Sequence, residues 1–436
     1  MKALVVGGGL AGLSAAYTLK KSGWQVTVLE AATYPGGRSS TVQHGGYSID
    51  RAATQLSSGY TEYLNLCREL GLSEYIHQCN SLVGIVRDGR IHEIDGSNNL
   101  SALLSPVISV AAKFTMLKTV VDAALMRPPL NYLELSNSYR HDNESIRQYA
   151  QRRLNTEVFD YIISPLLRGN FLQRPDAASK LDWFGIIRSF AGQQMLAMRG
   201  GINRLPAALA AQVDTRLQAR VTHIETTGDK VAVRWIENGV EHSELADACV
   251  VATRLPEAVQ ICPAYAQAAG ALNRKLTYSR VAVVHLGYTK ATRSKVLGVF
   301  ISAREHARIS LVWMDHNKLP ESAPEGHSLI SCYVESALND DCFGMTDAEL
   351  IGIGSEYVER LFPELRGTLD MSRVSRWPLA IPFPETGVYT EIHALRQRLN
   401  PQDRIQYAGD YFTCTGQNSA IYYGTQAARH LLTRST

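Results

Sequence analysis

Apolar residues along this chain form two kinds of pattern, one typical of buried strands and one typical of helices. The first thirty residues show both. The runs Ala3–Val6 and Trp24–Leu29 are short and nearly continuous, as in strands buried on both faces of a parallel sheet. The residues between them begin with three glycines and continue as an apolar segment that predicts a helix. The chain therefore opens with a predicted strand–helix–strand unit.

Later segments predict further elements of both kinds. Residues Gln218–Thr226 and Lys230–Ile236 alternate as antiparallel strands do, and Ala246–Ala252 predicts a buried strand. Asp88-Gly89 predicts the turn of a hairpin over Ser81–Ile94. The other expected elements are helices at Tyr60–Leu72, within Ser101–Ala191 and at Asp347–Phe362, and strands at Tyr278–Tyr288 and His327–Glu335.

The glycines of the opening unit carry its chemistry. Gly7 suits the tight turn, Gly9 a close approach of the backbone to a pyrophosphate, and Gly12 close packing of helix on strand. The following helix directs free N–H groups toward the phosphates. Glu30 ends the second strand, where a carboxylate accepts hydrogen bonds from an adenosine ribose. This pattern predicts dinucleotide binding.

Two further motifs, at opposite ends of the chain, indicate which dinucleotide. The run Glu30…Gly36-Gly37-Arg38…Gly46…Asp50 and the segments Ala408-Gly409-Asp410 and Ser419–Ala428 resemble the flavin amine oxidase, protoporphyrinogen oxidase and phytoene desaturase superfamily. The pattern is most similar to protoporphyrinogen oxidase-like proteins. The resemblance implies FAD rather than NAD, and an α/β fold with a Rossmann-type, glutathione reductase-like FAD-binding domain and a mixed α+β substrate domain.

The resemblance also implies how the chain divides. A discontinuous FAD-binding domain is expected from residues 1–75, 195–262 and 375–436. The substrate domain is expected from residues 76–194 and 263–374, with a helical portion near 101–191.

Matching the family motifs position by position gives the expected site. The expected FAD-binding residues are Gly7, Gly9, Leu10, Ala11, Gly12, Glu30, Ala31, Gly37, Arg38, Thr54, Gln55, Val221, Gly409, Asp410, Ser419 and Ala420. On the substrate side of the flavin we expect Trp377, Tyr422 and Gln55. Few titratable residues adjoin these motifs, so no strong protein base is expected.

The chain departs from the amine-oxidising members at three places. The segment Arg376–Phe383 has no cysteine for a covalent flavin link, so FAD is expected to bind non-covalently. The strand Ser279–Leu286 has no lysine to hold a water near flavin N5. The two tyrosines that form an aromatic cage for the amine in those enzymes are missing, because their positions fall near Leu379 and Gly416. These absences argue against simple amine oxidation.

The composition of the chain limits the partners and metal ions that it is expected to bind. With 436 residues and a net charge of +3, no nucleic-acid partner is implied. Seven scattered cysteines and twelve dispersed histidines predict neither a disulfide framework nor a metal site. The first residues enter a core strand directly, so no signal peptide and a cytoplasmic location are expected.

One segment, Leu103–Met126, is nearly as apolar as a membrane span, but Lys113, Lys118 and Asp122 interrupt it. It predicts an amphipathic helix whose apolar face lies against the protein core. Contact of that face with a membrane surface is the alternative. The face consists of Val107, Val110, Ala111, Phe114, Leu117 and Val121.

These observations predict an FAD-dependent oxidoreductase. It would take a hydride from a largely apolar small molecule, oxidising a C–C or C–N bond, and return the electrons to oxygen or another acceptor. Two alternatives stay open: a flavin-dependent isomerase without net redox, and a flavin-free lipid-binding chaperone of the GDP-dissociation-inhibitor type.

Overall fold

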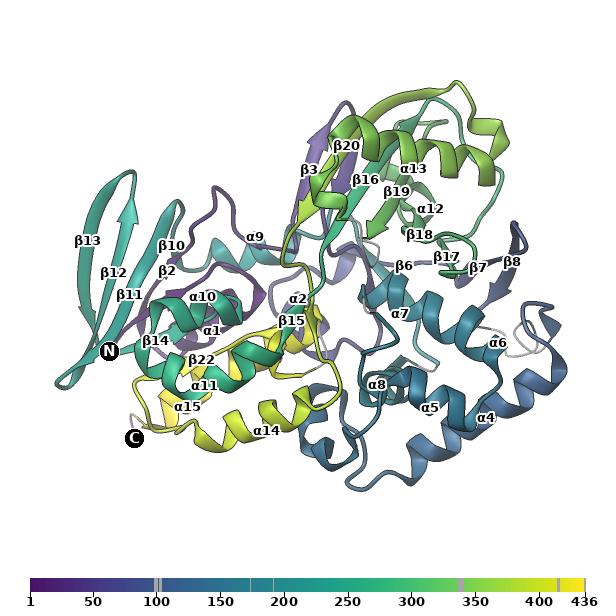
Figure 1. The fold of residues 1–436 in the computed structure, drawn as a ribbon. Coiled ribbons are helices and arrows are strands. Elements are labelled where there is room, and N and C mark those ends of the chain that lie inside the picture. The colour runs from purple at the N-terminus through teal and green to yellow at the C-terminus, as the bar shows by residue number, and fades with distance from the viewer. Residues whose placement is uncertain are drawn as a thin grey trace.

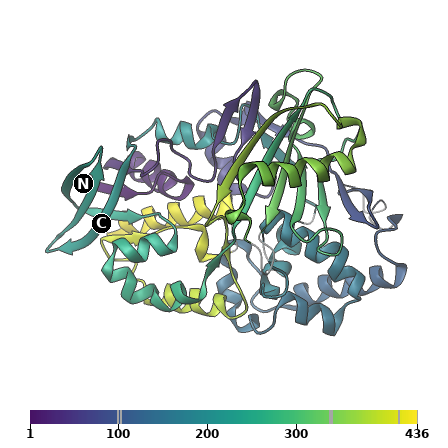
Figure 2. The same ribbon diagram turned by 45° about the horizontal axis from the view of Figure 1, so that its top comes forward.

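The computed structural model describes residues 1–97, 101, 104–172, 174–190, 192–335, 341–413 and 416–434. Leu103 and Ala191, which bound two predicted segments, lie outside these residues. A parallel sheet with its helices, and both chain termini, occupy one side of the molecule (Figure 1). A larger sheet and a group of helices occupy the other side, and a second view shows the same separation (Figure 2).

The parallel sheet has five strands in the order β10-β2-β1-β14-β22. They are β10 (Asp214–Arg216), β2 (Gln25–Leu29), β1 (Lys2–Val6), β14 (Ala248–Val251) and β22 (Ile405–Tyr407), and neighbouring strands all pair in parallel. β1 and β14 are almost completely buried, as their continuous apolar runs predict. The strand order reverses beside β1, and ligands of such sheets bind at the carboxyl ends of the strands there. The Rossmann-type fold class is confirmed.

Helix α1 (Leu10–Lys21) packs closely against the last helix, α15 (Gln417–Arg434). A Cβ at Gly424 would lie 2.1 Å from the carbonyl oxygen of Ala11 and 2.3 Å from Oγ of Ser14. Only glycine therefore permits this approach, which brings the N-terminal ends of both helices to the same region of the molecule.

One smaller sheet extends this side, and a hairpin lies beside the larger sheet (Figure 1). The strands β11 (Ala219–Thr227), β12 (Lys230–Glu237) and β13 (Val240–Ala246) form an antiparallel sheet, which confirms the alternating strands expected there. The strands β3 (Thr41–His44) and β4 (Tyr47–Asp50) form a hairpin, and β4 leads directly into the segment expected under the flavin.

The larger sheet has seven strands in the order β20-β16-β19-β18-β17-β7-β8. They are β20 (Leu369–Trp377), β16 (Val281–Tyr288), β19 (Ser328–Glu335), β18 (Ile309–Met314), β17 (Gly298–Ile301), β7 (Leu82–Arg87) and β8 (Arg90–Asp95). The predicted hairpin is confirmed, with Asp88 and Gly89 at φ of +53° and +71°. The predicted domain boundary at residue 375 falls inside β20.

Helices cover the remaining surfaces. One group below the larger sheet in Figure 1 comprises α4 (Val110–Leu125), α5 (Ile146–Arg153), α6 (Thr156–Val158), α7 (Ser164–Phe171) and α8 (Lys180–Phe190), with the 3₁₀ segment η2 (Tyr132–His141). The others include α2 (Thr61–Glu69), α9 (Arg204–Ala210), α10 (Leu255–Ile261), α11 (Pro263–Lys275), α12 (Asp315–Lys318), α13 (Asp347–Leu361) and α14 (Val388–Arg398).

One expectation about these helices is wrong. The apolar face of α4 was expected against the protein core, yet Val110, Phe114, Leu117 and Val121 are all more than half exposed. Of that predicted face, Val107 precedes α4 and is buried. The helix turns its small residues inward instead, because Ala112 and Ala123 allow close packing on the neighbouring helices.

Candidate active site

The turn between β1 and α1 leaves open space in front of the helix. Gly7 has a φ of +104°, and a Cβ at Gly12 would lie 1.9 Å from the carbonyl oxygen of Gly7, so both positions require glycine. A Cβ built on Gly9 meets no atom within 4 Å. Leu10 and Ala11 form the first turn of α1, where backbone N–H groups face this space. The cradle fits a pyrophosphate.

Glu30 closes the cradle on one side. Its carboxylate accepts hydrogen bonds from the backbone N–H of Gly8 at 2.6 Å and of Ala32 at 2.7 Å. The side chain therefore fixes the glycine turn and bends the chain at Ala31, and it sits at the edge of the sheet where the sequence places an adenosine ribose.

A second glycine turn lies beside the first. The N–H of Gly36 donates to the carbonyl oxygen of Gly8 at 2.7 Å, and Gly37, at a φ of +56°, approaches Gly9 closely. This turn directs Arg38 across the carboxyl edge of the sheet.

Arg38 meets Asp410 at this edge, although 372 residues separate them. Two guanidinium nitrogens lie 2.8 and 3.0 Å from the two carboxylate oxygens, and Arg38 also donates to the carbonyl oxygen of Ala380 at 2.8 Å. Burial lowers the pKa of Arg38, but the Asp410 carboxylate outweighs it, so the pKa lies above its ordinary value. Asp410 follows Gly409 directly after β22, so three predicted cofactor segments converge here.

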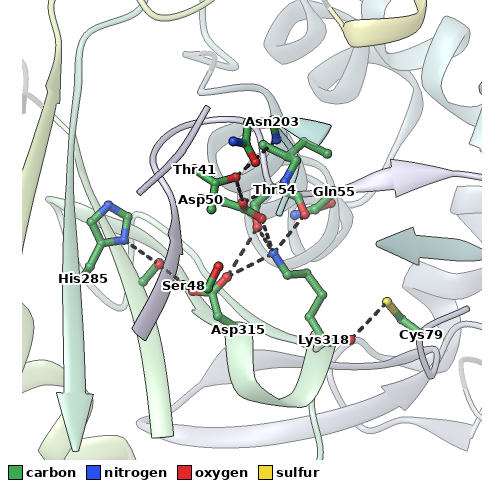
Figure 3. A network of polar contacts seen from close by, with 12 residues as sticks. Thr41, Ser48, Asp50, Thr54, Gln55, Cys79, Asn203, His285, Asp315 and Lys318 are labelled. Carbon is green, nitrogen blue, oxygen red and sulfur yellow. Dashed lines mark hydrogen bonds and ion pairs between the residues drawn. The ribbon is translucent and has the colours of Figure 1, made fainter. Parts of the chain in front are cut away.

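The segment after β4, residues 51–55, is held in place by the buried amine of a lysine. Lys318, at the end of α12, donates to the carboxylate of Asp50 at 2.8 Å and to the carbonyl oxygen of Thr54 at 3.2 Å (Figure 3). Its amine also lies 3.3 Å from the carboxylate of Asp315. Only 2% of the Lys318 side chain is exposed. Asp50 in turn accepts from Thr41 and from the backbone N–H of Ile202.

This cluster continues into the seven-stranded sheet. Ser331 donates to the carboxylate of Asp315 at 2.6 Å and lies 2.9 Å from Nδ1 of His285. The other imidazole nitrogen lies 3.1 Å from Oγ of Ser375. The chain of contacts from Asp50 to Ser375 thus joins the segment after β4 to strands β16, β19 and β20.

The electrostatics follow from burial and pairing. Burial lowers the pKa of Lys318, but the carboxylates of Asp50 and Asp315 outweigh it and raise the pKa above its ordinary value. Burial raises the pKa of Asp315, against the effect of Lys318. Burial, with the cations Arg373, Arg51 and Lys318 nearby, lowers the pKa of His285 to about 3, so its imidazole is neutral.

Of the three residues expected on the substrate side, Trp377 contacts the segment after β4 and Gln55 belongs to it. The indole of Trp377 donates to the carbonyl oxygen of Arg51 at 2.8 Å. The amide of Gln55 donates to Asn170 of α7 at 3.3 Å, and its backbone carbonyl accepts from Gln417 at 3.0 Å.

Tyr422 lies in a different setting. Its hydroxyl donates to Glu134 of η2 at 3.2 Å, and burial with that carboxylate raises its pKa. The residue is therefore directed toward the helical region, with no described contact to Trp377 or Gln55.

The remaining predicted cofactor residues are placed by their elements. Ser419 and Ala420 lie in the first turn of α15, and Ser419 donates to the carbonyl oxygen of Gly416 at 2.8 Å. Val221 is buried on β11. The N-terminal end of α15 and the glycine cradle are brought near each other by the close packing of α1 on α15.

Sequence reasoning missed several residues here. Lys318 and Asp315 stand in no family motif that we identified, and Asn170 and Gln417 became visible only as partners of Gln55. The expected lack of titratable residues near the motifs is also wrong, because Lys318 and Asp315 contact Thr54 directly and Asp50 is bound by the same lysine.

A parallel sheet with a glycine cradle, a second glycine turn and an arginine–aspartate pair at its carboxyl edge defines a dinucleotide-binding protein of the Rossmann-type class. Comparison with known proteins agrees. The model of the flavin-containing amine oxidoreductases matches residues 10–432, and the chain belongs to this family. It is accordingly an FAD-dependent oxidase or dehydrogenase.

Two relatives and one solved structure match almost the whole chain. It is 23% identical to coproporphyrinogen III oxidase of Bacillus subtilis, covering 99% of this chain and 97% of that protein. It is 23% identical to protoporphyrinogen oxidase 2 of Arabidopsis thaliana, covering 97% and 92%. A structure of a putrescine oxidase variant matches with a TM-score of 0.80 at 18% identity, covering 99% of both chains. This last likeness shows the fold alone.

The buried amine generates a stability prediction. In Lys318→Met, the carboxylates of Asp50 and Asp315 lose their common partner inside the protein, so the free energy of unfolding should fall by about 3–5 kcal/mol. Urea denaturation measures it. Lys290→Met removes an exposed lysine instead and should change stability by less than about 0.5 kcal/mol. Equal stability of both variants would contradict the role of Lys318.

The neutral imidazole generates a pH prediction. His285 has a folded pKa of about 3 and an unfolded pKa of about 6.5, so its stabilising effect is complete above pH 6.5 and is lost as the pH falls below that value. The free energy of unfolding should lose about 2 kcal/mol between pH 7 and pH 5 through this group. His285→Gln should remove that part of the loss, as measured by urea denaturation at both pH values. The exposed His44→Gln should keep it, and an unchanged slope in His285→Gln would count against a neutral buried imidazole.

Proposed function

We propose that this protein oxidises a largely apolar small molecule at a C–C or C–N bond with non-covalently bound FAD, and that oxygen or another acceptor takes the electrons. The observation that carries the proposal is the meeting of Arg38 and Asp410 beside the glycine cradle. The pair lies at the carboxyl edge of the sheet, where the sequence motifs place FAD. The proposal therefore favours a flavoenzyme over a lipid-binding chaperone.

The residues of the cradle would hold the cofactor by its polar half. The N–H groups at the start of α1 would bind the pyrophosphate, with Arg38 as a further cationic donor, and Asp410 would accept from ribityl hydroxyls. Glu30 would accept from the adenosine ribose. Bound flavin supplies a hydride acceptor that can be reoxidised by a second substrate.

The substrate would lie between the segment after β4 and the helical region. Three contacts support this placement: Gln55 with Asn170 of α7, Tyr422 with Glu134 of η2, and Thr413 with the carbonyl oxygen of Tyr132 in η2. Each joins a predicted flavin segment, or its direct neighbour, to the helical region. Trp377 would orient the substrate from the side opposite the helical region, because its indole is held by a hydrogen bond to the backbone of Arg51.

Relatives suggest where to look for the substrate. Two proteins matched along 97% or more of this chain are named as oxidases of porphyrinogens, which are large cyclic molecules built of C–C and C–N bonds. A porphyrinogen is therefore the first candidate, ahead of amines and polyenes.

Acid precipitation tests the non-covalent link. The segment Arg376–Phe383 has no cysteine, and the six cysteines of the described residues are buried, so all yellow colour should pass into the supernatant. Absorbance of supernatant and pellet measures it, with a covalent flavoprotein treated alongside. A yellow pellet would contradict the proposal.

Anaerobic mixing with candidate substrates tests the reaction and its active face. A true substrate should bleach the flavin, and Trp377→Ala should slow this bleaching by about tenfold to a hundredfold because the reacting bond is less well oriented. Trp377→Phe keeps an aromatic ring but loses the hydrogen bond to Arg51, so its rate should lie between the two.

FAD content, read from the absorbance of the purified variants, should be unchanged. Conversion of a substrate without bleaching would indicate an isomerase instead. Wild-type rates in both variants would show that substrate does not approach beside Trp377.

A further inference from the structure

Two arginines, Arg51 and Arg373, differ from the other arginines of the described chain. Both side chains are partly buried, yet among the described residues neither guanidinium has an ion pair or a hydrogen bond. Every other described arginine that is not exposed has such a partner, as Arg38 has in Asp410. The Nε atoms of Arg51 and Arg373 are moreover buried without an acceptor. Buried donors are rarely left so, and two of them indicate a site that receives an acceptor from outside the chain.

The two side chains belong to one region of the seven-stranded sheet. Arg373 and Trp377 are four residues apart on β20, so they project from the same face of the sheet. Arg51 reaches Trp377 from the end of β4, and its guanidinium carbon lies 5.6 Å from the centre of the indole ring. Arg373 stands directly opposite His285 on β16. Burial and then nearby cations, including both arginines, lower the pKa of His285, so the two positive charges lie near the same imidazole.

Aromatic rings hold the Arg51 guanidinium in place. The ring of Tyr34, from the loop after β2, has its centre 4.9 Å from the guanidinium carbon, and the Trp377 ring is the second contact. Aromatic faces attract a guanidinium and leave its N–H groups to bond within its plane. This is the direction from which a carboxylate or a phosphate accepts paired hydrogen bonds.

The carboxylates of this region are bound by other groups. Asp50 and Asp315 both pair with Lys318, and Asp370 on β20 accepts a hydrogen bond from Tyr47 at 2.8 Å. The two arginines therefore bring two positive charges that no described carboxylate pairs. Like charges near one another in a partly buried region favour the binding of an anion.

We propose that Arg51 and Arg373 form a binding site for an oxyanion, a carboxylate or a phosphate group, beside Trp377. Charge-assisted hydrogen bonds from guanidinium to such groups are about twice as strong as neutral ones. The oxyanion has two possible sources, a free ion or the acidic group of a larger molecule. The second source rests on the proposed function, in which Trp377 orients the substrate.

Titration calorimetry of the FAD-loaded protein with inorganic phosphate tests the site, in a zwitterionic buffer free of other oxyanions. The wild type should bind phosphate saturably. Arg51→Gln and Arg373→Gln should each weaken binding roughly tenfold or more, and the double variant should abolish it. Arg51→Lys keeps the charge but loses the planar fork, so its affinity should lie between those of the wild type and Arg51→Gln.

Arg220 supplies a matched control. It is an exposed arginine on β11, in the three-stranded sheet on the other side of the molecule, and has no ion pair among the described residues (Figure 1). Arg220→Gln should bind phosphate like the wild type. A second measurement covers a loss of folding in any variant: phosphate should raise the midpoint of thermal unfolding of the wild type and of Arg220→Gln, but not that of the double variant.

Anaerobic flavin bleaching separates the two sources of the oxyanion. The probes are a porphyrinogen with free carboxylates and its methyl ester. If the site receives the acidic group of the substrate, phosphate should slow bleaching by the free acid and not by the ester. If the site receives a free ion, phosphate should slow neither or both alike.

Three results would overturn the proposal. They are the lack of saturable phosphate binding by the wild type, undiminished binding by the double variant, and an equal loss in Arg220→Gln. Because the titration uses no substrate, its failure would leave the proposed oxidation untouched. A failure of porphyrinogen to bleach the flavin would in turn leave the titration to decide on the site.

Discussion

A lysine ammonium group that is almost wholly removed from water is stable here only because two carboxylates meet it. Lys318 lies against Asp50, which comes from the β3–β4 hairpin, and against Asp315, which comes from the end of the seven-stranded sheet. Removing Lys318 would leave two buried carboxylates without their cationic partner. The interaction thus ties the segment that leads to Thr54 and Gln55 to the seven-stranded sheet, and both must hold their positions for it to form.

Residues far apart in the sequence also meet at the carboxyl edge of the parallel sheet, where FAD is expected. Arg38 follows a glycine turn and Asp410 follows the end of β22, and the two side chains form an ion pair. The backbone carbonyl of Ala380 accepts a further hydrogen bond from Arg38. None of these residues is positioned by its sequence neighbours alone. The parallel sheet sets their common edge, and the close contact of α1 and α15 across Gly424 brings the two ends of the chain to it.

The sequence predicted well those features that depend on local pattern. The strand–helix–strand unit, the Asp88-Gly89 hairpin and the alternating strands β11 and β12 all follow from periodicity and turn chemistry. The family motifs added the convergence of Arg38 and Asp410. Lys318 escaped prediction because a single lysine between ordinary residues has no signature, and its partners lie 268 and 3 residues away. The α4 face was misassigned because periodicity identifies an apolar face without telling what covers it.

The order of the strands has a consequence for synthesis of the protein. β1 leaves the ribosome before the other strands of its sheet, whereas β22, Asp410 and α15 are among the last segments to do so. The parallel sheet is therefore incomplete during translation, and β14 waits for its outer neighbour until the final part of the chain emerges. Contacts of such long sequence separation form slowly and expose unpaired strand edges in the meantime. A chain interrupted between β14 and β22 would therefore carry the glycine cradle without Asp410 and α15, the other half of the predicted cofactor site.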